Sequence, residues 1–148
     1  MIPESKLIRS EITIRDMAIN DEIKLAKKSM VRWLALSLGL VSPNESRTLI
    51  FDILEVLFYA HIKKEQLTSQ QIFDKLESIT SEKTNEKAVY YHLLKLKEKG
   101  FLMGRDKKYF LTDENKSLSE FLKSFYSEKI RSSFEKITQI SSALEKSI

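Results

Sequence analysis

The chain has 148 residues, a length that suits one compact domain with some additional helix. It has no cysteine, which excludes disulfides and thiolate metal sites, and its 3 Gly and 2 Pro leave little material for a turn-rich β architecture. The 25 Lys and Arg against 21 Asp and Glu give a net charge of +4, a mild excess that permits a polyanionic partner.

No stretch of the sequence is typical of a membrane span or a signal peptide. The longest apolar stretch, residues 30–41, is interrupted by Arg32 and is shorter than the roughly 20 residues that a span needs. The first residues lack the basic start and apolar run of a signal peptide, so we expect a cytoplasmic protein. A membrane-surface anchor over residues 24–41 stays open, although a buried helix explains the same residues more simply.

Residues 1–45 are expected to form an N-terminal arm and a helix that contact the core or a second copy of the chain. Residues 12–15 alternate like a short strand, but their flanks also suit an arm or a frayed helix. Apolar residues at helical spacing predict a helix from about Asn20 to Leu38. Asn20 is placed to cap the start of this helix, and Gly39 is placed to end it.

Residues 46–113 are expected to form one small domain of three helices and a hairpin. The first helix, residues 47–61, is strongly apolar and reads as the central helix of the core. A short helix follows over residues 67–76, with a Thr or Ser cap. The third helix is predicted from residue 85 to about residue 99, with Thr84 as its cap and a left-handed glycine after its end.

Two further elements complete the predicted order. Residues 101–112 indicate a β-hairpin whose arms flank a charged turn at residues 104–107. Residues 114–148 contain no Gly or Pro, and their apolar residues recur at steps of three or four, which predicts one long amphipathic helix. These steps average more than 3.5 residues, so we do not predict a regular left-handed coiled coil. The expected fold class is mainly α with a small β-hairpin.

Two segments of this layout resemble a known group of proteins. Residues 88–102 (AVYYHLLKLKEKGFL) resemble the third helix of the ArsR, PadR and MarR-like transcriptional regulators, and residues 109–114 (YFLTDE) resemble the end of their wing. The resemblance implies a winged helix-turn-helix flanked by an N-terminal helical extension and a long C-terminal helix. It also implies a homodimer that binds double-stranded DNA and regulates transcription.

The third helix is expected to have one buried face and one face that contacts DNA. At 100° per residue, Val89, Leu93 and Leu96 share the face that packs on the core. The opposite face would enter the major groove, and by resemblance the basic residues of the wing would reach the minor groove or the phosphates. The expected DNA-binding residues are Thr84, Lys87, Tyr91, Lys95, Arg105, Lys107 and Lys108. Taken singly, each is about as compatible with an ordinary solvated surface.

The last helix has an apolar stripe that is too extensive for one winged domain to cover, so we expect it to pair two copies of the chain. The expected interface residues are Leu118, Leu122, Phe125, Ile130, Phe134, Ile137 and Leu144. Leu94 departs from the family pattern, which usually has a basic or polar residue there. We therefore expect Leu94 and the neighbouring Tyr90 to pack against the N-terminal segment or the partner subunit.

Other functions find less support in the sequence. There is no glycine-rich phosphate loop, nucleophile motif or pair of carboxylates at a recognisable site, so we expect no catalysis and no cofactor. His61 and His92 lie far apart, so we expect structural histidines and no metal site. The main alternative to DNA binding is a winged-helix module for protein–protein interaction, which Glu86 and Glu98 on the third helix keep open. The sequence does not reveal whether a small effector binds.

Overall fold

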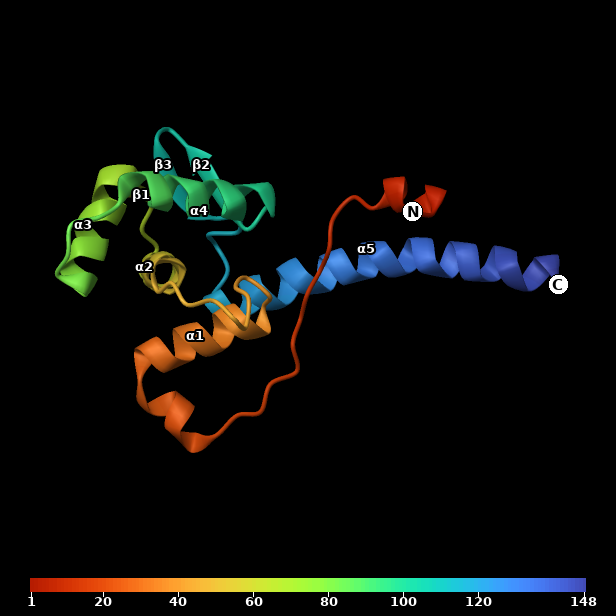
Figure 1. Cartoon of the computed structure of the whole chain (residues 1–148), viewed down its shortest axis with the longest axis horizontal. Helices are drawn as coiled ribbons and strands as arrows, with labels where there is room; N and C mark the ends of the chain where they lie inside the picture. The colour runs from red at the N-terminus through yellow and green to blue at the C-terminus, as the bar shows by residue number, and fades with distance from the viewer.

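The computed structural model describes residues 1–148. The chain is mainly helical, with one small antiparallel sheet and a long C-terminal helix that projects away from the sheet and the helices packed on it (Figure 1). In chain order the elements are η1 (Pro3–Leu7), η2 (Asp21–Leu25), α1 (Lys27–Ser37), α2 (Leu49–Ile62), β1 (Leu67–Thr68), α3 (Ser69–Thr80), α4 (Glu86–Glu98), β2 (Leu102–Arg105), β3 (Lys108–Leu111) and α5 (Leu118–Ser147).

Helix α2 is the centre of the core, as its apolar sequence predicts. It contacts α1, α3, α4, α5 and strand β3, and most of its residues are buried. A helix that is apolar on nearly every side requires such a surrounding. Phe58 of α2 lies edge-on to Phe101, which in turn packs edge-on against Phe121 of α5 at 5.3 Å between ring centroids. These rings connect the central helix with the start of the hairpin and the last helix.

Local capping explains where α3 and α4 begin. Thr68 accepts a hydrogen bond from the backbone N–H of Gln71, whose side chain accepts from the N–H of Thr68, which is a complete capping box. For α4 the predicted cap was wrong by one residue. The side chain of Asn85, rather than Thr84, accepts the hydrogen bond from the N–H of Ala88.

The sheet has the strand order β1-β3-β2, and both pairs are antiparallel. The hairpin is confirmed, but its turn is tighter than the predicted residues 104–107. Only Asp106 and Lys107 lie between the strands, with φ of 54° and 64°, as in the two-residue turns that match the twist of a hairpin. Strand β1 was not predicted, because two residues carry no readable periodicity.

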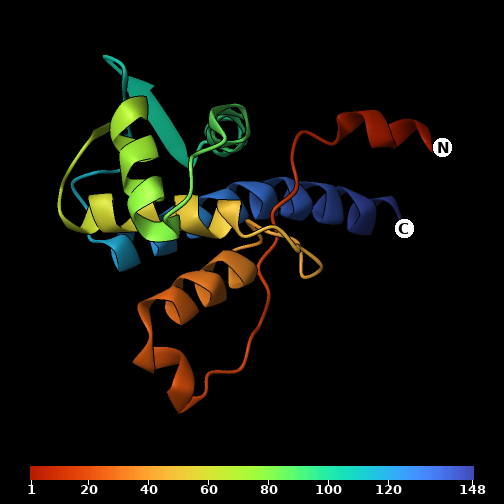
Figure 2. The ribbon, with the colours of Figure 1, turned by 60° about the vertical axis from the view of Figure 1, so that its left-hand side comes forward.

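The predicted helix from Asn20 to Leu38 is interrupted. Its first part is the 3-10 helix η2, and α1 begins only after Ala26, whose backbone is extended. The predicted ends are confirmed, because Asn20 accepts a hydrogen bond from the N–H of Ile23 and Gly39 has a φ of +66°. Figure 2 shows η2 and α1 on one side of the molecule, followed by the loop that leads into α2.

The segment before η2, residues 8–20, is an extended arm attached to the end of α1. The guanidinium of Arg15 donates hydrogen bonds to the carbonyls of Leu36 and Val41, at 2.7 and 2.9 Å. The backbone N–H of Arg15 donates to the carbonyl of Ser37, and the Ser37 hydroxyl donates to the carbonyl of Arg15. Arg15 thus binds the arm to the last turn of α1 and to the loop that follows it, and its N–H satisfies the carbonyl of the last helical residue, Ser37.

Helix α5 has two parts with different surroundings. Its start, after the cap Ser117, packs on the core, whereas its far part projects away from α2, α3 and α4, on the same side as the N-terminal η1 (Figures 1 and 2). Leu118, Leu122 and Phe125 were expected at a dimer interface, and this expectation requires correction. Leu122 belongs to the chain's own core, and Leu118 and Phe125 pack against that core.

Candidate nucleic-acid interface

Helix α4 has the two faces that its sequence predicts. Val89, Leu93 and Leu96 are buried against the core. Lys87 and Tyr91 lie on the opposite face and are exposed to solvent. The helix begins at a defined cap and ends before Gly100, whose φ is +76°. The burial of the three apolar side chains fixes the rotation of the helix about its own axis.

The cations on this face differ in their partners. Lys87 has no carboxylate within ion-pair distance. Lys95 lies 3.6 Å from a carboxylate oxygen of Glu98, and its ammonium is also 5.5 Å from the centroid of the Tyr91 ring. Lys87 therefore presents an unneutralised charge, whereas the charge of Lys95 is partly compensated by its own helix.

Thr84 has a different role from the one expected. Its hydroxyl donates a hydrogen bond to the carbonyl of Phe73 at 3.2 Å, and its N–H donates to the carboxylate of Glu77. Both partners belong to α3, so Thr84 fixes the turn between α3 and α4. Its side chain is half-buried and already hydrogen-bonded, which makes it a positioning residue for α4 rather than a free contact residue.

The hairpin carries the second set of expected residues. Lys107 at the turn and Lys108 beside it are exposed and have no carboxylate partner. Arg105 is directed toward the base of the hairpin, where its guanidinium lies 3.4 Å from Glu114 and 4.9 Å from the centroid of the Phe110 ring. The free positive charge of the hairpin therefore lies at Lys107 and Lys108, beside the exposed carboxylate of Asp106, which also has no ion-pair partner.

Lys97 is a further cation beside this surface, and sequence reasoning did not include it. Its ammonium lies 5.9 Å from the centroid of the Tyr109 ring on β3, between the end of α4 and the hairpin. A Cβ on Gly104 would lie 3.3 Å from this ammonium, so the glycine leaves room for it. The available signal was a basic residue in the last turn of the helix, which is too common a feature to select it.

Of the two partners expected to cover Tyr90 and Leu94, the N-terminal segment does not do so, and the partner subunit stays a prediction. Tyr90 and Leu94 are 45% and 52% exposed, and the only aromatic partner of Tyr90 is Phe73 of α3. The arm lies instead on the other flank of α4. There, residues 10–13 border a groove of 480 Å³ together with the end of α1, the start of α5, and Lys95, Glu98 and Lys99.

His92 faces the loop before α2 and is half-buried. This burial lowers the pKa of His92 below its ordinary value of 6.5, and Arg47 acts in the same direction while Glu45 opposes it. The imidazole is therefore held in its neutral form near neutral pH. This agrees with a structural histidine at the edge of the core face.

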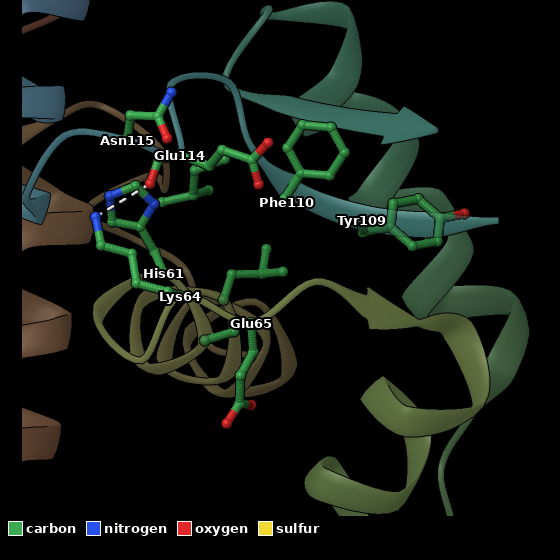
Figure 3. A pocket seen from close by; sticks show the side chains of 10 residues that line it. His61, Lys64, Glu65, Tyr109, Phe110, Glu114 and Asn115 are labelled. Atoms are coloured by element: carbon green, nitrogen blue, oxygen red, sulfur yellow. Dashed lines mark hydrogen bonds between the residues drawn. The ribbon is translucent and has the colours of Figure 1, made fainter. Parts of the chain in front are cut away.

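A separate small cavity lies between the end of α2 and strand β3 (Figure 3). The buried His61 donates a hydrogen bond from Nε2 to the carbonyl of Lys116 at 2.7 Å, and Lys64 donates to the carbonyl of Glu114 at 3.2 Å. The cavity measures 110 Å³, which is below the size of typical ligand pockets. These contacts connect α2 to the loop before α5, so the cavity belongs to the framework.

No group of three or more His, Cys, Asp or Glu residues is arranged to hold a metal ion. No helix of the chain combines the length and the apolar character needed to cross a membrane. Comparison with protein-family models, with curated proteins and with solved structures gave no match to the chain.

Proposed function

We propose that this chain is a winged helix-turn-helix protein that binds double-stranded DNA as a homodimer and regulates transcription. In this proposal α3 and α4 are the helix-turn-helix, with α4 as the recognition helix, and β2 and β3 are the wing. The recognition helix enters the major groove and the wing contacts the neighbouring backbone or minor groove. The protein performs no catalysis.

The order of elements supports the proposed fold. A central helix, a short strand, two further helices and a hairpin follow one another, and the short strand completes the sheet beside the hairpin. The end of α4 leads into β2 after only a few residues, and α4 packs against β2, which holds the recognition helix next to the wing. A rigid platform of this kind suits the insertion of one helix into the major groove.

The observation that carries the proposal is the free positive charge on the exposed face of α4 and at the hairpin turn. Lys87, Lys107 and Lys108 have no carboxylate partner, and Lys95 lies on the same outer side of α4 beside Tyr91. Lysine ammonium groups neutralise phosphates, and this electrostatic term supplies most non-specific affinity for DNA. The tyrosine adds a hydroxyl and a ring within reach of base edges.

A second candidate function is docking of another protein on α4. Tyr90 and Leu94, one helical turn apart, are about half exposed, and exposed apolar residues at adjacent turns are typical of a helix that packs on a partner. DNA also accommodates apolar side chains, which contact thymine methyl groups in the major groove. The charge on the outer face favours DNA as the partner.

The test is the affinity of the protein for a mixed-sequence DNA duplex, measured by fluorescence anisotropy at increasing salt. A Lys87→Ala, Lys95→Ala double variant should bind more weakly and reduce the slope of log affinity against log salt. The expected reduction is about 0.9 for each lost phosphate contact. Lys87 should contribute more than Lys95, because Glu98 already compensates part of the Lys95 charge.

The matched control is a Lys136→Ala, Lys146→Ala double variant, which removes the same charge from the far part of α5. It should leave the salt slope unchanged. Tyr91→Ala should mainly reduce discrimination among duplexes selected from a random pool, because base edges rather than phosphates carry sequence information. Absence of salt-sensitive affinity for any duplex, or equal slopes for the two double variants, would refute the DNA proposal and favour the protein-docking function.

A further inference from the structure

The far part of α5 has the largest unpartnered apolar surface among the helices. Four of its apolar side chains are between 51% and 70% exposed: Phe134, Ile137, Ile140 and Leu144. None of them belongs to the core or packs against it, since α5 reaches the core through its start. A contiguous apolar stripe of this kind on a helix requires a partner to be buried.

The spacing of the stripe identifies the type of packing. Beginning at Ile130, the stripe has alternating steps of four and three residues: Ile130, Phe134, Ile137, Ser141, Leu144 and Ile148. This is the 3.5-residue repeat of a two-stranded coiled coil. The average over the whole helix is larger because it includes the start of α5, which faces the chain's own core.

Ser141 is compatible with a position inside this stripe. Its hydroxyl donates a hydrogen bond to the carbonyl of Ile137 at 2.7 Å, on the same helix. The group therefore needs no partner from another chain when it is covered, and its burial leaves no donor unsatisfied. Its small volume also leaves room for a larger neighbour from a facing helix.

We infer that the partner is a second copy of α5 that runs antiparallel to the first. The inference rests on the homodimer of the proposed function and specifies its interface. Phe134 faces Leu144 of the partner subunit, and Ile137 faces Ser141 of the partner subunit. The two-fold axis passes near residue 139, and the two copies of the core domain lie at opposite ends of the helix pair.

Charge complementarity selects this orientation. Arg131 directly follows the stripe residue Ile130, and Glu145 directly follows the stripe residue Leu144, so both lie along the same side of the stripe. When the second helix is reversed, Arg131 lies opposite Glu145 of the partner subunit, and the two-fold axis repeats the pair. Glu145 has no ion-pair partner within its own chain, whereas Arg131 already pairs with Glu128 and Glu135 of its own helix, so the contact with Glu145 of the partner subunit adds a third carboxylate to this cluster.

A parallel pair of helices in register would bury the same residues with poorer packing and poorer charge pairing. It places Ser141 opposite Ser141 of the partner subunit, which leaves a void in the seam. It also gives Arg131 no acidic partner on the second helix and places Ile140 beside Glu145 of the partner subunit. In the antiparallel pair Ile140 packs against Ile140 of the partner subunit near the axis, where it covers the space beside the small Ser141.

Single-cysteine variants of the full chain test the orientation, because the natural sequence has no cysteine. Under mild oxidation Ile140→Cys should form a covalent dimer. Ile130→Cys should not, because its two copies lie about 27 Å apart along an antiparallel pair. A mixture of Ile130→Cys and Ile148→Cys should again form a covalent dimer, since these positions face each other.

Charge reversal tests the ion pair, with dimer dissociation measured by analytical ultracentrifugation. Glu145→Arg should raise the dissociation constant about tenfold, because two ion pairs become two repulsions. Adding Arg131→Glu should restore part of the affinity, because it re-forms the interchain pairs but removes the contacts of Arg131 with Glu128 and Glu135 of its own helix. Lys136→Glu is the control for charge reversal on the outer side of α5 and should have little effect.

Three outcomes would overturn the inference: a monomer at micromolar concentration, a covalent dimer of Ile130→Cys without one of Ile140→Cys, or a stable dimer that neither position links. Failure of the proposed DNA function has a different signature. In that case Ile140→Cys still cross-links, while the protein shows no salt-sensitive affinity for a duplex.

Discussion

Replacement of Gly39 by alanine should detach the N-terminal arm from the end of α1. An added Cβ would lie 2.6 Å from the Cβ and 2.8 Å from the carbonyl oxygen of Thr13, where carbon atoms normally approach no closer than about 3.5 Å. Gly39 also has a φ of +66°, a conformation that favours glycine. The substitution therefore destabilises the protein in two ways: through the left-handed backbone conformation of residue 39 and through the steric overlap with Thr13.

The two costs can be separated with a second glycine. Gly100 has a φ of +76°, but an added Cβ there would have no heavy atom within 4 Å. Gly100→Ala should therefore lower the free energy of unfolding by the left-handed cost alone, about 1–2 kcal/mol. Gly39→Ala adds the overlap with Thr13. Overpacking typically costs about 1–3 kcal/mol, so we expect a total of about 2–5 kcal/mol.

Urea unfolding followed by circular dichroism measures both variants, and limited trypsin digestion reports on the arm. In Gly39→Ala the arm should move away to relieve the overlap, which breaks the hydrogen bonds of Arg15 to the carbonyls of Leu36 and Val41 and exposes the bond after Arg15 to cleavage. Gly100→Ala should be cleaved there at the native rate. Equal destabilisation of the two variants and equal cleavage of the arm would refute the reasoning.

Three further substitutions test contacts of the fold. Tyr126→Phe removes the 2.7 Å hydrogen bond to the carbonyl of Leu38 and should lower the free energy of unfolding by about 1 kcal/mol. Burial raises the pKa of Tyr126 to about 12, so the free energy of unfolding of the native protein should fall as pH rises from 10 to 12. A pH series of urea titrations measures this fall, and the part that Tyr126 contributes should be absent in the variant. His92→Gln should reduce the loss of stability that occurs below pH 6.5, because the pKa of His92 is lowered in the folded protein and the unfolded chain therefore binds the proton first. Thermal melts at pH 5 and pH 7 measure this loss. A difference in melting temperature between the two pH values that is the same in the variant and the native protein would contradict the prediction. Thr68→Ala removes the cap of α3 and should cost about 1 kcal/mol in urea unfolding. Thr48→Ala is the matched control, because Thr48 stands at the N-cap of α2 but makes no side-chain capping hydrogen bond.

The regular elements were predictable where their signals are local. The apolar period of α4 identified Val89, Leu93 and Leu96 as its buried face, and Gly100 marked its end. Each signal depends on residues within a few positions of one another, whose relative directions are fixed by helix geometry. For the same reason the exposure of Lys87 and Tyr91 could be predicted before the structure was known.

Choices between chemically equivalent neighbours depended on tertiary contacts. Thr84 and Asn85 are both good N-terminal caps, and the sequence alone does not rank them. In the structure the hydroxyl of Thr84 is already bonded to the carbonyl of Phe73, so Asn85 caps α4. The partner that decides this lies eleven residues away from Thr84, on another helix.

The position of the arm and the division of α5 were decided in the same way. Sequence reasoning placed either the arm or a partner subunit beside Leu94. The hydrogen bonds of Arg15 to the carbonyls of Leu36 and Val41 hold the arm on the other flank of α4. The sequence of α5 determined one continuous amphipathic helix, but only the packing of Leu122 on the core separates the intramolecular part from the exposed part. Helical periodicity determines which side chains share a face, because that relation is local. The tertiary structure determines what each face contacts, because a contact requires a second surface brought there by a distant part of the chain.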